Sequence, residues 1–312
     1  MEGVHTFSKS TLDNYHISVM PSEAITGLKV KRDGTYIDCT LGGGGHTLEI
    51  IKKGGIVLGI DQDSDALKHF RAKLSFTNNK AVEGENLFLA NGNFKDIDKI
   101  AKEFNFSLVD GIIYDLGVST HQLREKERGF SFGTDAKLDM RMDLNACLSA
   151  KEVVNTKPAK ELYEIFTKYG EEKRAWSIAN AIVRARLVKE IETTTELALL
   201  IEQVRGRSKN SFDRTHPATR VFQSLRIYVN EELDCLKESL PKALNLIRKN
   251  GRLVVISFHS LEDRIVKNFI KRKEDERVLE NITKKPIRPS LFEIEKNKSS
   301  RSGKLRVAQK LI

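Results

Sequence analysis

The chain has 312 residues, enough for one large domain or two ordinary ones with an ample hydrophobic core. No window approaches the roughly 18 uncharged apolar residues of a membrane span. The polar and acidic N-terminus (residues 1–15) has no apolar signal core, so we expect a cytosolic protein. Three scattered cysteines, Cys39, Cys147 and Cys235, fit neither a disulfide framework nor metal spacing, and we expect them to be small buried residues.

The formal net charge of +10 is unevenly distributed. Residues 267–312 hold 14 Lys and Arg against 6 Asp and Glu. Six basic residues and a single acid, Asp213, lie between Arg205 and Arg226. Clustered positive charge favours a polyanion partner, and a solvated basic surface is the alternative. Membrane lipid is less favoured, because neither cluster contains a basic amphipathic helix with a strong apolar face.

The most informative stretch contains four consecutive glycines, Gly42 to Gly45. A strand-forming run with Tyr36 and Ile37 enters them, and a helical apolar pattern over residues 48–51 leaves them. A second apolar run, residues 56–60, ends on Asp61. This order of strand, glycine turn, helix, strand and acid predicts a parallel α/β domain that holds a nucleoside-containing cofactor. Glycines let the backbone approach a ligand closely, and the acid can accept bonds from both ribose hydroxyls.

The glycine pattern also indicates which cofactor to expect. The dinucleotide fingerprint G-x-G-x-x-G would need a third glycine at Thr47 or Leu48, and neither is one. Asp38, just before the turn, would place a negative charge near a pyrophosphate, whereas a carboxylate suits the sulfonium or amino end of S-adenosylmethionine. We therefore expect S-adenosylmethionine rather than NAD. A turn without a ligand is disfavoured because four glycines lose much chain entropy on ordering.

Strand and helix patterns alternate as far as Asp115. The expected elements are helices over residues 64–74 and 97–104 and strands over 87–90 and 111–114. The alternation then stops at a long irregular stretch, residues 117–142, of a kind that is usually functional. Helical patterns follow over residues 159–189, 194–204, 217–229 and 231–248, before a strand at 253–258.

We therefore predict an α/β domain made of residues 1–124 and 214–312, interrupted by an all-helical insertion over residues 125–213. The polar and basic residues 284–302 are expected to form a mobile loop. A terminal strand over residues 307–312 follows it.

In an open parallel sheet, ligands bind at the carboxyl ends of the strands. Five segments reach that edge: Asp38 with Gly42–His46, Asp61, Asn91–Phe94, Asp115–Ser119 and Ser257–His259. Phe94 can stack on an adenine face and Asn93 can bond an adenine edge. The alternative is that Phe94 is an ordinary core aromatic.

The segment Asp115-Leu-Gly-Val-Ser119 lies where amino-group methyltransferases usually place the substrate nitrogen. An exocyclic amine on a nucleobase is a poor nucleophile, so the site must accept its hydrogen bonds and hold it in line with the donor methyl. We expect Asp115 and Ser119 to act here, and Asp139 and Arg141 to reach the base or its phosphate. Alternatively, Asp115 touches only the donor, Ser119 closes a turn, and Asp139 and Arg141 form a salt bridge.

Metal and hydrolytic chemistry are less well supported. The seven histidines show no spacing such as H-x-x-x-H, and no cysteine pair supports zinc, so we expect no metal site. His259 and Ser260 are adjacent in sequence, and such neighbours cannot generally meet as a nucleophile–base pair.

These motifs resemble those of the bacterial ribosomal small-subunit methyltransferase H family (MraW-type), over nearly the whole chain. In chain order they are His16-Ile-Ser-Val-Met, Asp38 to His46, Asp110 to Ser119, Glu127-Arg-Gly-Phe-Ser-Phe132, Leu138 to Asp143, His216-Pro-Ala-Thr-Arg220, Ile256 to Arg264 and Ser300 to Arg306. Any one of them is a weak signal, but all of them in this order are highly specific.

The resemblance implies a class I S-adenosylmethionine-dependent methyltransferase, Rossmann-like with a mostly parallel sheet, whose helical insertion recognises RNA. It implies methylation of N4 of a cytidine in the decoding region of 16S rRNA, in the small ribosomal subunit, with S-adenosylhomocysteine as product. Donor-binding positions map onto Gly44, Gly45, His46, Asp61, Phe94, Asp115 and Gln122. Candidate RNA contacts are Arg141, Arg207, Lys209, Arg214 and Arg220.

Two departures from the family pattern are present. The family usually reads Ser-Ser-Pro after Gly-Val, whereas this chain has Ser119-Thr120-His121, which leaves the conformation of that loop open. The family turn often has an Arg among its glycines, and here it has only Gly. The alternative functions are an NAD-type oxidoreductase and a non-catalytic RNA-binding or assembly factor. The oligomeric state is left open, a homodimer included.

Overall fold

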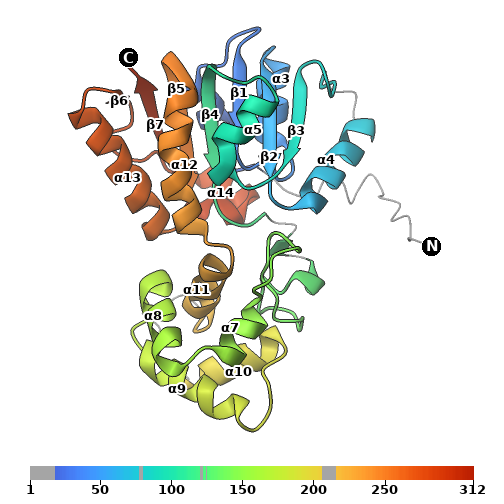
Figure 1. Cartoon of the computed structure of the whole chain (residues 1–312), viewed down its shortest axis with the longest axis vertical. Coiled ribbons are helices and arrows are strands. Elements are labelled where there is room, and N and C mark those ends of the chain that lie inside the picture. The colour runs from blue at the N-terminus through green and yellow to red at the C-terminus, as the bar shows by residue number, and fades with distance from the viewer. Residues whose placement is uncertain (1–17, 77–79, 120–121, 124, 206–215) are drawn as a thin grey trace. The chain divides into compact units, whose positions relative to one another are not determined.

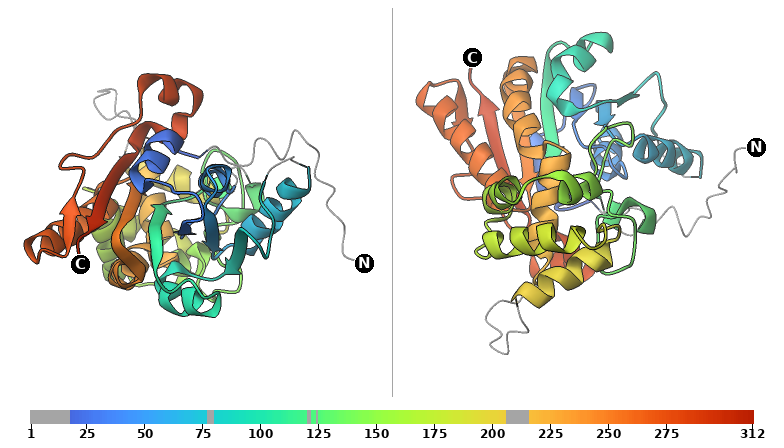
Figure 2. Two further views of the ribbon diagram at one scale, coloured as in Figure 1. Left: turned by 90° about the horizontal axis from the view of Figure 1, so that it is seen from above. Right: turned by 60° about the horizontal axis from the view of Figure 1, so that its bottom comes forward.

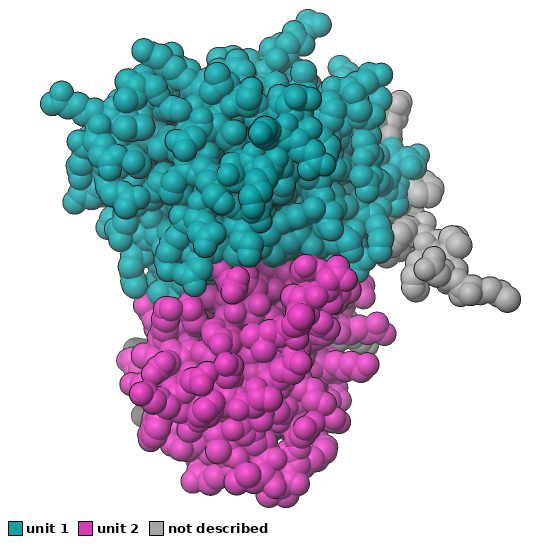
Figure 3. Space-filling view, in the orientation of Figure 1, with its two compact units in different colours: residues 1–120, 233–312 teal, residues 121–232 magenta. Residues whose placement is uncertain are grey.

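The computed structural model describes residues 18–76, 80–119, 122–123, 125–205 and 216–312. The chain divides into two compact units (Figure 3). The first unit contains residues 1–120 and 233–312, and the second contains residues 121–232.

The first unit is built on a seven-stranded sheet in the order β3-β2-β1-β4-β5-β7-β6. Its strands are β1 (Thr35–Asp38), β2 (Ile56–Asp61), β3 (Leu87–Asn91), β4 (Val109–Asp115), β5 (Ile247–Ser257), β6 (Leu279–Asn281) and β7 (Lys304–Lys310). Strands β1 to β5 pair in parallel, while β7 is antiparallel to both β5 and β6 (Figure 1). The chain order reverses between β1 and β4, and this switch point is where open α/β sheets bind ligands.

Helices cover both faces of this sheet (Figure 2). One face packs on α2 (Pro21–Leu28), α3 (Gly45–Lys52) and α4 (Ser64–Phe76), and the other on α5 (Ile97–Glu103), α12 (Glu232–Leu246) and α13 (Ser260–Asp275). Alternate residues of β4 show why its sequence is uniformly apolar. Ile112 and Tyr114 enter one core, and Ile113 enters the other.

The second unit is helical. It contains α7 (Ala150–Thr156), α8 (Ala159–Gly170), α9 (Ala175–Arg186), α10 (Thr194–Arg205), α11 (Thr219–Val229) and the short η2 (Lys126–Arg128). Helix α8 packs on α9 and α11. A side chain at Gly170 would lie 2.5 Å from the Arg220 carbonyl oxygen, so the glycine permits the close approach of α8 to α11. Because α11 packs on α8, this unit extends beyond residue 213, where the predicted insertion ended.

The predicted mobile loop over residues 284–302 is instead a folded segment. It contains α14 (Leu291–Lys296) and η3 (Lys298–Ser302), and Ser300 is fully buried. The Met20 N–H donates to Glu293 Oε1 at 2.6 Å, which fastens the segment to the residue before α2. Among the cysteines, Cys39 and Cys235 are buried as expected, but Cys147 is exposed because it lies in the irregular segment before α7. Within the described ranges, no helix is long and apolar enough to cross a membrane.

Candidate functional site

The glycine turn connects β1 to α3. Gly42 and Gly44 adopt left-handed backbone conformations, with φ of 48° and 70°. A Cβ at Gly44 would lie 2.0 Å from the Phe70 ring, and one at Gly45 would lie 2.1 Å from Ser18 Oγ. Gly44 is therefore required by its positive φ and by packing against Phe70, whereas the obstacle at Gly45 is only the small Ser18 side chain. The role predicted for Gly44 and Gly45, close approach of the backbone to the donor, stays a prediction.

Asp61 ends β2 and joins two neighbouring turns. Its Oδ2 accepts the Gly42 N–H at 2.8 Å, and its Oδ1 accepts the Asp63 N–H at 2.9 Å. Burial raises the pKa of this carboxyl to about 6, against the lowering effect of these two hydrogen bonds. Each carboxylate oxygen has a second lone pair, so Asp61 can still accept bonds from ribose hydroxyls.

Asp38 ends β1 and is 1% exposed. Its Oδ2 accepts the Thr47 hydroxyl at 2.8 Å, and its Oδ1 accepts the Thr40 N–H at 3.2 Å. Burial raises the pKa of Asp38 above its usual value. The carboxylate therefore holds the glycine turn against the start of α3, in addition to any effect of its charge on a cationic ligand.

His46, in the first turn of α3, meets Asp115 at the end of β4. His46 Nε2 lies 3.3 Å from Asp115 Oδ2, and both side chains are more than nine-tenths buried. Burial would lower the pKa of His46, but the hydrogen bond and charge of Asp115 outweigh it and the pKa is raised. The Asp115 N–H donates to Thr40 Oγ1 at 2.7 Å, which joins β4 to the turn after β1. Among the described residues, His46 Nδ1 is buried without a hydrogen-bond partner.

The structure thus brings Asp38, His46, Asp61 and Asp115 together at the carboxyl edge of the sheet, beside the switch point between β1 and β4. These residues come from the ends of three strands and from the start of one helix. The charges of His46 and Asp115 act on Asp38, and the charge of Asp38 acts on Asp61. The site is therefore acidic and partly desolvated, with His46 as its one basic side chain.

Phe94 and Asn93 lie at the short helix η1 (Phe94–Asp96), after β3. The Phe94 ring is half-buried and meets the Tyr114 ring edge-on, with centroids 5.6 Å apart. Asn93 caps η1 by accepting the Lys95 N–H at 2.9 Å, and its amide donates to Gln62 Oε1 at 2.8 Å. Phe94 therefore has a packing role in the core. Stacking on adenine stays a prediction for it.

Asp139 and Arg141 form the salt bridge that was the alternative to a role at the base. Arg141 Nη2 donates to Asp139 Oδ2 at 2.8 Å, and its Nε donates to Oδ1 at 2.8 Å. Its Nη1 donates to the carbonyls of Leu144 and Ala146 at 3.1 and 2.8 Å. Burial would raise the pKa of Asp139, but Arg141 lowers it below its usual value. Both side chains are thus used within the loop of residues 139–146.

The other predicted positions are spread over the chain. Ser119 is half-buried and follows β4, whereas Gln122 is a buried residue of the second unit. Arg220 lies in the first turn of α11, and its Nη1 donates to the Glu171 carbonyl at 3.0 Å. Arg207, Lys209 and Arg214 lie outside the described residues.

Two of the C-terminal motifs turn out to meet each other. His259 is the N-cap of α13: its Nδ1 accepts the Glu262 N–H at 3.4 Å, and Glu262 Oε2 accepts the His259 N–H at 3.2 Å in return. Asp263 binds Arg306 Nε at 2.7 Å and lies 3.6 Å from Lys304 Nζ. Sequence reasoning missed these roles, although a histidine followed three residues later by a glutamate was a signal for the cap.

Comparison with known proteins gives the same assignment as the motifs. The chain matches the MraW methylase family over residues 13–311. It is 46% identical over 315 residues to "Ribosomal RNA small subunit methyltransferase H" of Clostridium botulinum (strain Loch Maree / Type A3), covering 95% of this chain and 99% of that one. The proteins of the same name from Carboxydothermus hydrogenoformans and Thermomicrobium roseum are 45% and 44% identical, over 95% and 96% of this chain and 98% and 95% of theirs.

The described residues fit the cofactor of such an enzyme. Three carboxylates suit a ligand with a sulfonium and an amino group, Asp61 suits a ribose, and the buried Nδ1 of His46 is available for a polar contact. An NAD-type oxidoreductase is therefore set aside. The chain belongs to the MraW methylase family and is an S-adenosylmethionine-dependent methyltransferase with a class I, Rossmann-like fold.

Proposed function

We propose that this enzyme transfers a methyl group from S-adenosylmethionine to N4 of a cytidine in the decoding region of 16S rRNA. The substrate is the RNA within the small ribosomal subunit, S-adenosylhomocysteine is the second product, and the methylated amine releases one proton. The names of the relatives support the class of RNA. The observation that carries the chemistry is the buried His46–Asp115 pair at 3.3 Å, beside Asp61 at the switch point of the sheet.

We assign a role to each of these residues, and the geometry supports the assignment. Asp61 accepts the ribose hydroxyls, and Phe94 packs against the adenine. The side chain of Asp115 is oriented by His46, and its backbone N–H is bonded to Thr40, so it offers a fixed negative charge near the methyl group. Such a charge stabilises the positive charge that the cytosine amine acquires as it attacks. Ser119, which follows β4, completes the proposed site within the first unit, and a role for Gln122 in donor binding stays a prediction from the family resemblance.

We assign recognition of the RNA to the helical second unit. A cytosine must leave its stack to reach a buried site, at a cost of a few kcal/mol. Contacts with the RNA backbone elsewhere on the protein offset this cost. The basic residues Arg207, Lys209, Arg214 and Arg220 are the candidates for these contacts. We give Arg141 a structural role instead, because its donors already serve Asp139 and two carbonyls.

The test is a methylation assay on small subunits that lack the modification, with a donor labelled on the methyl group. Digestion of the RNA to nucleosides should place the label on N4 of one cytidine. Asp115→Asn should lower the rate by about two orders of magnitude, because it removes a charge aimed at the reacting nitrogen. Asp234→Asn, at an exposed ion pair on α12, is the matched control and should keep the parent rate.

Two results would reject the proposal. One is label on another nucleoside, which would change the acceptor. The other is the absence of any label although S-adenosylhomocysteine binds, which would favour a non-catalytic RNA-binding or assembly factor.

A further inference from the structure

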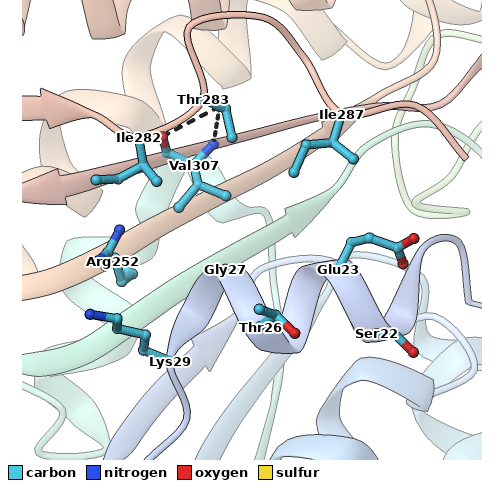
Figure 4. Close-up of a pocket in the computed structure, with 10 residues that line it drawn as sticks. All are labelled: Ser22, Glu23, Thr26, Gly27, Lys29, Arg252, Ile282, Thr283, Ile287 and Val307. Atoms are coloured by element: carbon cyan, nitrogen blue, oxygen red, sulfur yellow. Dashed lines mark hydrogen bonds between the residues drawn. The ribbon is translucent and has the colours of Figure 1, made fainter.

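A pocket outside the proposed methyl-transfer site lies in the first unit, between α2 and the segment that follows β6 (Figure 4). We call it the α2 pocket. Its volume is about 430 Å³, within the range of small-molecule sites. The lining residues that matter here are Glu23, Lys29, Arg252, Ile282, Ile287 and Val307. None of these residues belongs to the methyl-transfer site described above.

The Arg252 end of the pocket is remote from the carboxyl edge of the sheet, whereas Ile287 at the other end pairs with Leu305, which lies opposite Ile256 near that edge. Arg252 pairs with Gly111 near the beginning of β4, whereas Ile256 pairs with Asp115 at its end. Four residues of a strand span about 13 Å. A ligand in the α2 pocket near Arg252 therefore does not occupy the donor site.

The roof of the pocket is held in place by β7. The Ile282 N–H donates to the Val307 carbonyl at 3.0 Å, and the Val307 N–H donates to Thr283 Oγ1 at 2.8 Å. Farther along, Ile287 and Leu305 exchange two hydrogen bonds of 2.9 Å. On the floor, a Cβ at Gly27 would lie 2.8 Å from Val307 Cγ2, so the helix already packs on the strand there. The pocket is thus built by fixed backbone on two sides.

Arg252 is the unusual group in this pocket. Its residue is 6% exposed, and its Nε is buried without a hydrogen-bond partner among the described residues. No carboxylate of the described chain forms an ion pair with it, and the charge of Glu280 acts on it only from farther away. Burial lowers the pKa of its guanidinium. A buried cation without a close anion is costly, so the site favours a ligand that supplies one.

The remaining walls define the rest of the ligand. Lys29 lies at the same end as Arg252, whereas Glu23 lies at the opposite end (Figure 4). Ile282, Ile287 and Val307 line the space between them. A helix rises about 1.5 Å per residue, so the distance from Glu23 to Lys29 along α2 is about 9 Å. This is close to the length of an eight-carbon chain. The negative charge of Glu23 disfavours a second anionic group at that end.

We propose that the α2 pocket binds an aliphatic monocarboxylate, with its carboxylate on Arg252 and Lys29 and its chain along Ile282 and Ile287. The planar guanidinium matches a carboxylate in two parallel hydrogen bonds.

The test is an NMR titration of the full chain, with isotopically labelled isoleucine methyl groups and sodium octanoate as the probe. Octanoate should shift the Ile282 and Ile287 methyl signals, and the shifts should reach a plateau as more octanoate is added. 1-Octanol and inorganic phosphate should each bind at least about tenfold more weakly than octanoate. 1-Octanol lacks the carboxylate, and phosphate lacks the aliphatic chain. Arg252→Met should weaken octanoate binding about tenfold or more. Lys271→Met, which removes one exposed positive charge from α13 on the other face of the sheet, is the control and should not change it.

Equal binding of 1-octanol and octanoate would overturn the proposal, as would equal binding of octanoate to Arg252→Met and the parent. Isoleucine signals that do not move would also overturn it. Arg252→Met should be at least as stable as the parent, because it removes a buried charge. If it does not fold, Ile287→Trp serves instead, since the larger side chain fills the pocket and should abolish octanoate binding.

Discussion

The acids of the donor site are held in place by bonds within the protein, and these bonds leave them partly desolvated. Asp38 and Asp61 each accept two hydrogen bonds from the glycine turn or its neighbours, yet burial still raises the pKa of both. A carboxylate that ionises in such a place lowers the stability of the ligand-free protein. A cationic, ribose-containing ligand offsets this loss of stability when it binds. The affinity of the site is therefore linked to the lower stability of the ligand-free protein.

Asp61 makes this link measurable. The pKa of its carboxyl is about 6 in the folded protein, against an ordinary value of 3.8. Between these values the folded state holds a proton that the unfolded state has released, so the contribution of Asp61 to the free energy of unfolding falls as the pH rises from about 4 to 6. The full effect is at most about 3 kcal/mol. Asp61→Asn cannot titrate, so its stability relative to the parent should rise by about 1–3 kcal/mol over this window.

Urea unfolding of the two proteins at a series of pH values checks this prediction. The hydrogen bond lost with one carboxylate oxygen lowers the stability of Asp61→Asn equally at every pH, so only the pH dependence is diagnostic. Asp234→Asn, at an exposed ion pair, should follow the parent curve. Parallel curves for Asp61→Asn and the parent would show that the Asp61 pKa is not raised. S-Adenosylmethionine should bind Asp61→Asn much more weakly at any pH.

Among the elements of the fold, the glycine turn combines a backbone requirement with a packing requirement. Gly44 has a φ of 70°, and a Cβ there would lie 2.0 Å from the Phe70 ring. Gly84 also has a positive φ, 91°, but a Cβ there would meet nothing within 4 Å. Gly44→Ala should therefore cost about 3 kcal/mol or more, as the sum of backbone strain and overpacking. Gly84→Ala should cost only about 1 kcal/mol.

Unfolding in urea compares these two variants directly. The excess cost of Gly44→Ala should shrink when Phe70 is also changed to Ala, because the methyl group then has room. An equal cost for Gly44→Ala and Gly84→Ala would mean that Phe70 moves aside easily, and that the packing argument fails.

The elements that sequence reasoning found are those with a local signature. The apolar run of β4 and the amphipathic pattern of α12 depend on residues that are neighbours in the chain, and the acids at the strand ends follow from the topology of a parallel sheet. The short helices α2 and α14 were not found. α14 has no buried residue of its own, and its place depends on the bond between Glu293 and Met20.

Some side-chain roles could not be predicted from the sequence either, because they depend on residues that are distant in the chain. A glycine is needed at position 44 because of Phe70, which lies in a different helix. Asp263 forms its ion pair with Arg306, which lies in the last strand. The limit of the second unit was misplaced because α11 has the same amphipathic pattern whichever unit it packs on. Only the contact of α11 with α8 shows that α11 belongs to the second unit.

At the scale of the whole molecule, the net charge of +10 suits an enzyme that acts on RNA, but the basic residues are not equivalent. We expect a local role for those between Arg205 and Arg226, which belong to the second unit. Helix α13 packs on one face of the sheet through its buried apolar residues, and its basic residues have no such assignment. Variants that remove the same charge from each region separate a local contact from a general attraction.

Changing Arg207, Lys209 and Arg214 together to Gln should weaken binding to small subunits and leave binding of S-adenosylhomocysteine unchanged. Each phosphate contact contributes about 0.7 to 0.9 to the slope of log K against log salt, so three lost contacts should reduce the slope by about 2 to 3. The matched control changes Lys267, Lys271 and Arg272 of α13 to Gln. If both triple variants lose affinity and slope equally, attraction by the total charge explains binding, and the helical unit loses its special role. A reduced slope in the first variant alone would locate the RNA contacts on the second unit, since both variants carry the same net charge.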